Sequence, residues 1–288
     1  GAQPLLDAIH PVAFVDIAAR RFHRALPVVH RVAEPAFIAH AIGIDRDAAP
    51  GDLALDPVAF IGAGTAATTT EELPASDLYL IGCPDDSIRE CCALLADSTL
   101  PFNKSTVFHL SGALSSQELA SAREAGAAIA SIHPVKSFAD PARAVDDFSD
   151  TWCGCEGDAQ ALAMLEPAFA AIDARLFSID ADNKRLYHAA SVIACNYLVA
   201  LQEVSLRTLE EAGVERKLAV QILGPILHGT VRNILDLDTV AALTGPIARG
   251  DAVTVEGQLQ ALADWNPEFA QLYRQLGRIA ADLSEKQG

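Results

Sequence analysis

Three polar residues in one predicted helix could carry acid/base chemistry. Lys184, His188 and Asn196 follow one another at spacings of four and eight residues, which places them roughly along one helix face. A Lys or His that faces a ligand can give or take a proton in general acid/base catalysis. Taken singly, such residues are more often surface or core residues. Here the helix leaves the last predicted strand and should line a cleft between two domains, where small-molecule sites concentrate.

Three successive predicted strands also end in polar or small residues. Cys83-Pro84-Asp85 follows the strand at 78–82, Ser111-Gly112 follows the strand at 106–110, and His133 follows the strand at 128–132. In doubly wound sheets, ligands bind outside the carboxyl ends of parallel strands. The pattern therefore predicts one ligand-binding edge built from three strands.

The elements that must position these residues change character along the chain. Strand-like runs alternate with helical segments up to about residue 180, which is typical of βαβ crossovers. Four longer helices are then expected, punctuated by glycine and proline. The predicted fold is α/β, with a Rossmann-like, mostly parallel sheet domain over 1–181 and an all-helical domain over 182–288. The expected strands are 78–82, 106–110, 128–132, 151–155 and 176–179, and the expected helices are 86–97, 115–125, 158–173, 183–212, 214–235, 252–264 and 266–284.

Composition narrows the class of protein. The 288 residues carry a formal charge of −17, which opposes binding to nucleic acid, and 51% are apolar, which excludes a disordered chain. No uninterrupted run of roughly 18 apolar residues occurs, so we expect no membrane span. We also expect no signal peptide, because no basic segment precedes an apolar core. The six cysteines are spread widely, which favours a reducing cytoplasm.

One cysteine pattern could suggest a metal site, and one glycine pattern could suggest a cofactor site. Cys153-Gly154-Cys155 has no second Cys/His pair at zinc-site spacing, so we interpret it as a strand with small buried residues and expect no metal. The segment 60–67 matches the G-x-G-x-x-G/A fingerprint of a dinucleotide loop. Pro74 follows too soon for the helix that such a loop should open, so the match is weak evidence for a cofactor site.

Five segments in order resemble a bacterial two-domain family. Its members pair a Rossmann-like NAD(P)-binding domain with a helical C-terminal domain of unknown function similar to that of 6-phosphogluconate dehydrogenase. More distantly, the chain is similar to pyrroline-5-carboxylate reductase and to deazaflavin-dependent NADP reductases. The resemblance covers about residues 57–265 and is carried by DLYLIGCPDD at 77–86, FHLSGA at 108–113, SIHPVKSF at 131–138, KRLYHAA at 184–190 and LTGPIARGD at 243–251.

The resemblance implies an NAD(P)-linked oxidoreductase. It places Cys83-Pro84-Asp85 and Ser111-Gly112 beside the nicotinamide half of NADP or NAD, and we expect His133 at the same edge. It gives Lys184 the place of a catalytic lysine; an Asn is expected about one turn later, but position 188 is His and the next Asn is Asn196.

The first 55 residues depart from this pattern. The resemblance requires a phosphate loop near residues 16–20, and that stretch contains no glycine. Two interpretations stay open: divergence of the site, or translation of this segment from a shifted reading frame. Translating the other two frames upstream of the Pro57 codon distinguishes them, since a strand followed by G-x-G-x-x-G would identify a frame error.

Two functions follow from these observations. The first is hydride transfer between NADP or NAD and a small molecule in the interdomain cleft, with Lys184 or His188 as the acid/base. The alternative is a non-catalytic binding or regulatory protein that keeps the two-domain frame without a competent dinucleotide loop. In either case the apolar helix at 183–212 predicts a homodimer formed through the helical domains.

Overall fold

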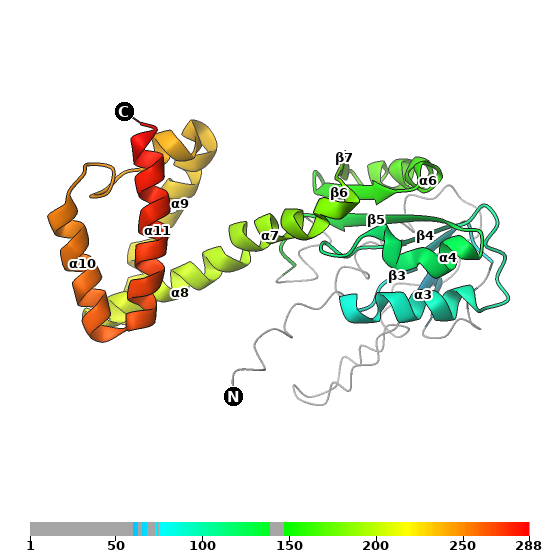
Figure 1. Ribbon diagram of the computed structural model, residues 1–288, viewed down its shortest axis with the longest axis horizontal. Coiled ribbons are helices and arrows are strands. Elements are labelled where there is room, and N and C mark those ends of the chain that lie inside the picture. Colours follow the sequence, from blue (N-terminus) through cyan, green and yellow to red (C-terminus); the bar gives the residue numbers. More distant parts are fainter. Residues whose placement is uncertain (1–59, 63–64, 68–72, 74, 139–146, 288) are drawn as a thin grey trace. The chain divides into compact units, whose positions relative to one another are not determined.

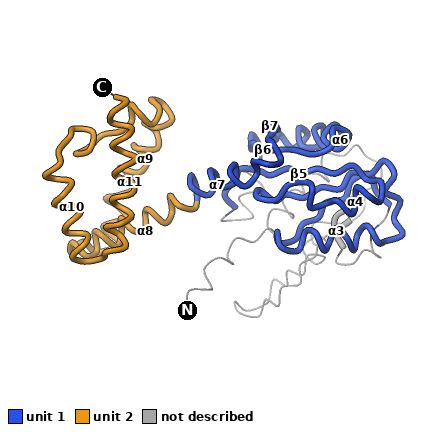
Figure 2. The backbone as a smooth tube through the Cα atoms, in the orientation of Figure 1, with its two compact units in different colours: residues 1–195 blue, residues 196–288 orange. Residues whose placement is uncertain are grey.

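A computed structural model describes residues 60–62, 65–67, 73, 75–138 and 147–287. It divides into two compact units between Cys195 and Asn196 (Figure 2). The phosphate loop that the resemblance requires near residues 16–20 lies outside the described residues.

The first unit contains a sheet whose described strands have the order β2-β1-β3-β4-β5-β6-β7. β3, β4 and β5 are parallel, β6 runs antiparallel to β5, and β7 is parallel to β6. These strands reproduce the expected ones closely, and the expected α/β, Rossmann-like class is confirmed. The strands are β1 Phe60–Gly62, β2 Thr65–Ala67, β3 Leu78–Ile81, β4 Thr106–His109, β5 Ala128–Pro134, β6 Trp152–Gly157 and β7 Arg175–Ser178.

Helices pack on both faces of this sheet (Figure 1). On one face, α3 (Ile88–Ala96) and α4 (Ala120–Glu124) bury apolar side chains against Tyr79, Val107 and Ile129. On the other face, α6 (Ala159–Ala170) packs on Phe108 and Ile132. Both faces of the central strands are therefore apolar along most of their length, as buried parallel strands require. The short helices between these elements are η2 Asp85–Ser87, η3 Ser116–Leu119 and η4 Ala181–Asn183.

The segment with the dinucleotide fingerprint forms no phosphate loop. β1 ends at the first of its glycines, Gly62, and pairs antiparallel with β2 and with β3. A phosphate loop needs a helix N-terminus directly after the glycines. The fingerprint at 60–67 is thus a coincidence of composition within strand-forming residues.

The predicted long helix at 183–212 is interrupted once. α7 (Lys184–Ala194) belongs to the first unit, and α8 (Asn196–Glu211) begins the second. The second unit continues with α9 (Arg216–Ala242), α10 (Ala252–Trp265) and α11 (Pro267–Glu285). The helical character expected after residue 181 is confirmed. Asn266 caps α11 by accepting the backbone N–H groups of Glu268 and Phe269, and Pro267 occupies its first turn.

Many apolar side chains on these helices are exposed. Tyr197, Val199, Leu235 and Val253 are between 62% and 81% exposed within the chain. Among the described residues one helical stretch, Ala181–Glu211, is long and apolar enough to cross a membrane by length and composition alone. Its mean hydropathy is 1.4 over 18 residues, and none of that window is buried. Polar residues interrupt it, so it is not an uninterrupted apolar run.

Candidate functional site

The site is built on a row of three polar residues across neighbouring strands. His109 of β4 lies opposite Ser131 of β5, which lies opposite Glu156 of β6. Since side chains alternate along a strand, residues paired in this way point to the same face of the sheet. All three are buried. A polar row inside an apolar sheet must find its hydrogen-bond partners within the protein.

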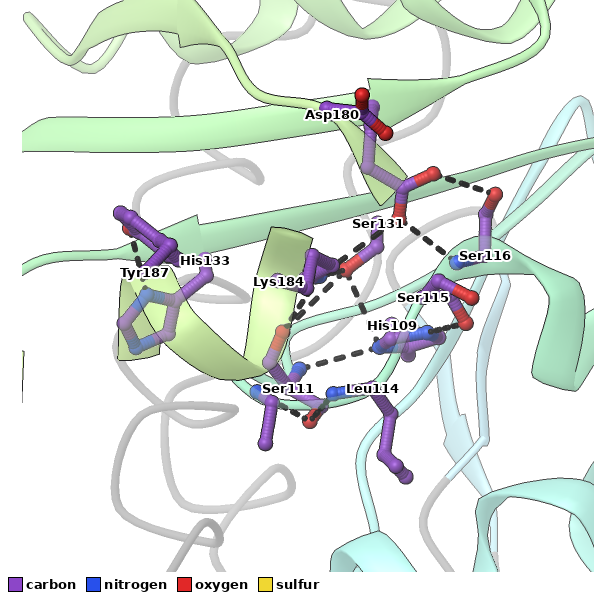
Figure 3. Close-up of polar contacts among 12 residues, drawn as sticks. His109, Ser111, Leu114, Ser115, Ser116, Ser131, His133, Asp180, Lys184 and Tyr187 are labelled. Carbon is purple, nitrogen blue, oxygen red and sulfur yellow. Dashed lines mark hydrogen bonds and ion pairs between the residues drawn. The ribbon is translucent and has the colours of Figure 1, made fainter. Parts of the chain in front are cut away.

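Lys184 provides the partner for this row (Figure 3). Its Nζ donates to the backbone oxygen of Ser111 at 2.8 Å and to the Oγ of Ser131. It also lies 3.7 Å from Oε1 of Glu156. Lys184 is 1% exposed and Glu156 is 6% exposed, so this is a buried ion pair. The two hydrogen bonds engage two of the three ammonium protons, and Glu156 adds an ion-pair contact that is longer than a hydrogen bond.

Burial lowers the pKa of Lys184 to about 8, and the carboxylates of Glu156 and Asp85 oppose this shift. A pKa of about 8 keeps the ammonium mostly charged at pH 7, but brings its deprotonation close to the physiological range. The charge of Lys184 therefore depends on its carboxylate neighbours.

His109 fixes the loop that follows β4. Its Nδ1 accepts the backbone N–H of Ser111 at 3.1 Å, so its Nε2 donates to the backbone oxygen of Ser115, also at 3.1 Å. Burial, followed by the charge of Lys184, lowers the pKa of His109 to about 3. The imidazole is thus neutral at pH 7 and acts as a bridge across the loop.

A second row of paired residues crosses β5 two residues nearer its carboxyl end, and it has aromatic side chains on either side of a glycine. His133 of β5 lies opposite Gly154 of β6, which lies opposite Phe177 of β7. The Tyr187 hydroxyl occupies the space above the glycine: a Cβ at Gly154 would be only 2.7 Å from it. A hydrogen bond of 2.9 Å joins this hydroxyl to Nδ1 of His133. Gly154 is required because any side chain there would displace Tyr187.

His188 completes the site one helical turn after Lys184. Its ring lies edge-to-face against His133, with the centroids 5.3 Å apart. Both rings lie against Gly112, where a Cβ would be 2.7 Å from Nε2 of His133 and 2.8 Å from Cδ2 of His188. Burial lowers the pKa of His188, with Lys184 acting in the same direction and Asp85 against it. His188 is half-buried, so it remains within reach of a ligand.

The turns after β3 and β4 are tied together by Ser111. Its Oγ donates to Oδ2 of Asp85 at 2.8 Å and accepts the backbone N–H groups of Ala113 and Leu114. Pro84 immediately precedes Asp85 at the start of η2. The exposed carboxylate of Asp85 is thereby held at the edge of the sheet.

The structure brings most of the predicted site residues together, but not all of them. Asp85, Ser111, Gly112, His133, Lys184 and His188 meet at the carboxyl ends of β3, β4 and β5. Cys83 is instead a core residue packed beside α3, and the neighbouring thiol of Cys91 together with burial raises its pKa. Asn196 is exposed in α8, in the second unit. Cys153 and Cys155 are buried in β6, as expected for small strand residues.

The sequence interpretation missed Ser116, Ser131, Glu156 and Tyr187 as members of the site. One signal was available for Glu156: a carboxylate in an otherwise apolar or small strand needs a buried partner. The partner itself could not be identified, because Lys184 lies 28 positions further along the chain in another element.

The fold and this site define a class: a Rossmann-like sheet domain followed by a helical domain, with polar residues gathered at the carboxyl edge of the parallel strands. Residues 151–280 match the family model of a domain of unknown function, DUF2520. The resemblance to a two-domain family with a helical C-terminal domain of unknown function is thereby confirmed.

Solved structures with this arrangement cover most of the chain. Protein TM1727 from Thermotoga maritima is 28% identical, with a TM-score of 0.63 over 78% of this chain and 84% of that one. A protein from Bacteroides fragilis assigned as an NADP oxidoreductase is 18% identical, with a TM-score of 0.66 over 93% of this chain and 94% of that one. An imine reductase from Streptomyces aurantiacus is 15% identical, with a TM-score of 0.53 over 95% and 92%. The chain has no significant match to a protein of curated function.

Proposed function

We propose that this protein is an oxidoreductase that transfers hydride between NADP or NAD and a small molecule. One observation carries the proposal: Lys184 and His188 lie against Ser111, Gly112 and His133 at the carboxyl edge of the parallel strands. That edge is where doubly wound sheets bind dinucleotides. The NADP oxidoreductase named above shares the fold, which supports this choice of cofactor.

The residues at this edge fit the nicotinamide half of such a cofactor. Gly112 has no side chain and adjoins two rings, and Asp85 is fixed by Ser111 in the neighbouring turn. When bound, the cofactor would supply or accept the hydride. The protein would supply the accompanying proton from Lys184 or His188.

We also propose that the apolar helix surface is covered by a second copy of the chain. A membrane fits this surface less well. Lys184 and His188 are held at the sheet, which leaves 189–202 before the exposed charge of Glu203. That segment spans about 21 Å at roughly 1.5 Å per residue, whereas a bilayer core is about 30 Å thick. The proposed homodimer would be cytoplasmic, because all six cysteines are free thiols.

Titration of the protein with NADPH and with NADH, followed by cofactor fluorescence, tests the proposal. We expect saturable binding at micromolar concentration to the wild type. His188→Ala should keep this binding while turnover of a carbonyl, imine or hydroxy compound falls roughly 100-fold, the usual size of a general acid/base contribution. Failure of the wild type to bind either cofactor would favour the non-catalytic protein considered above.

A further inference from the structure

Glu156 is the buried carboxylate of the site, and both of its oxygens are engaged. Oε1 accepts the backbone N–H of Ser116 at 2.7 Å and faces Lys184. Oε2 accepts the hydroxyl of Ser116 at 2.7 Å. Glu156 thus contacts the C-terminal end of the loop after β4. Lys184 contacts the N-terminal end of that loop, through the backbone oxygen of Ser111.

We propose that Glu156 is a positioning residue: through its buried ion pair with Lys184 it fixes the loop after β4 against the first turn of α7, and so holds His188 over Gly112. Lys184 then belongs to this positioning pair, and His188 is the group that exchanges the proton. This inference rests on the function proposed above and assigns the separate roles of its residues.

The contacts of Lys184 argue against a direct role in proton transfer. A proton donor must come within about 2.6–3.2 Å of the atom that it serves. The side chain of Lys184 is 1% exposed, and its ammonium donates to Ser111 and Ser131 and lies beside Glu156. To reach a substrate it would have to break this buried network. His188 is one turn further along the same helix and is half-buried beside Gly112.

The charge of Lys184 depends on its surroundings from several elements. Burial favours the neutral amine, and Glu156 is the largest influence that keeps it charged. The charged and titratable groups that face it are Asp85 of η2, His109 of β4, His133 of β5, Cys155 and Glu156 of β6, and His188 of α7 itself. Removing the charge of Glu156 without changing its shape should therefore release the proton of Lys184 at lower pH.

Glu156→Gln tests the inference in the full-length protein. We expect the pKa of Lys184, measured by NMR of the lysine side chains, to fall by one unit or more. Turnover at pH 7.5 should fall at least 10-fold, while the affinity for NADPH changes less than 3-fold. The matched control is Glu118→Gln, because Glu118 pairs with Arg89, whose side chain is 73% exposed, and it should leave these quantities unchanged.

Lys184→Arg separates the two roles. An arginine keeps the positive charge but cannot give up a proton near neutral pH. Turnover within 10-fold of the wild type supports a positioning role. A folded Lys184→Arg variant that binds NADPH but loses at least 100-fold in turnover would make Lys184 the proton donor and overturn the inference.

Two further measurements keep the inference testable. One uses a milder variant in case Glu156→Gln does not fold, and the other needs no enzymatic activity. Ser116→Ala removes only the hydroxyl partner of Glu156 and keeps its charge, so it should change the pKa of Lys184 much less than Glu156→Gln does. The NMR contact between the rings of His133 and His188 needs no substrate, and it should weaken in Glu156→Gln. Unchanged ring contacts in that variant would refute the positioning role, whether or not the wild type proves to be an oxidoreductase.

Discussion

Replacement of Lys184 by methionine should strongly destabilise the first unit. Methionine has a similar volume, but it removes the cation and leaves the carboxylate of Glu156 buried with only Ser116 as a partner. Breaking a buried ion pair by removing one member costs about 3–5 kcal/mol of the free energy of unfolding. At roughly 2–4 °C per kcal/mol for a protein of this size class, the melting temperature should fall by about 6–20 °C.

The double variant Lys184→Met/Glu156→Gln isolates the cause of this loss. A neutral amide tolerates burial without a cation, so the double variant should recover at least half of the melting temperature lost by Lys184→Met. Circular dichroism at pH 7.5 measures all three proteins. Lys104→Met is the control, because Lys104 is an exposed residue of the same unit. A loss below about 1 kcal/mol in the single variant, which is the size expected for a surface pair, would refute the reasoning.

Three further predictions concern the rings, the pH dependence and the assembly. Gly112→Ala should reduce turnover at least 10-fold, because the new Cβ would meet His133 and His188; Gly257→Ala, with nothing within 4 Å of its Cβ, serves as the control in the same assay. The pKa of His109 in the folded protein, about 3, lies below its unfolded value of about 6.5. Unfolding therefore takes up a proton in this window, and stability should fall as the pH drops from 6.5 toward 3. His109→Gln should flatten the dependence of the melting temperature on pH, and an unchanged slope would contradict the assignment. Light scattering should give twice the chain mass of 30.4 kDa, and a 30 kDa species across a wide concentration range would contradict the homodimer.

The sequence by itself determined the order and type of the elements. Alternating short apolar runs and helical segments identified the strands from β3 to β7, because backbone periodicity and turn residues act locally. The same local signals placed Asp85, Ser111 and His133 at strand ends. They also placed Lys184 and His188 on one face of α7, since residues four apart on a helix are neighbours.

Only the tertiary structure decided which of these groups touch. Strand register set His109, Ser131 and Glu156 in one row, and His133, Gly154 and Phe177 in the next. Register between strands far apart in sequence depends on how the whole sheet packs, which no local pattern specifies.

The role assigned to Lys184 from the structure differs from the role predicted from the sequence, for the same reason. In the sequence it is a cation at a helix start, which is usually exposed; in the fold it is buried against a carboxylate from another strand. Burial and that single partner set its charge and direct its protons. Both arise only when β6 and α7 come together, because desolvation and ion pairing depend on distances in space and not on spacing along the chain.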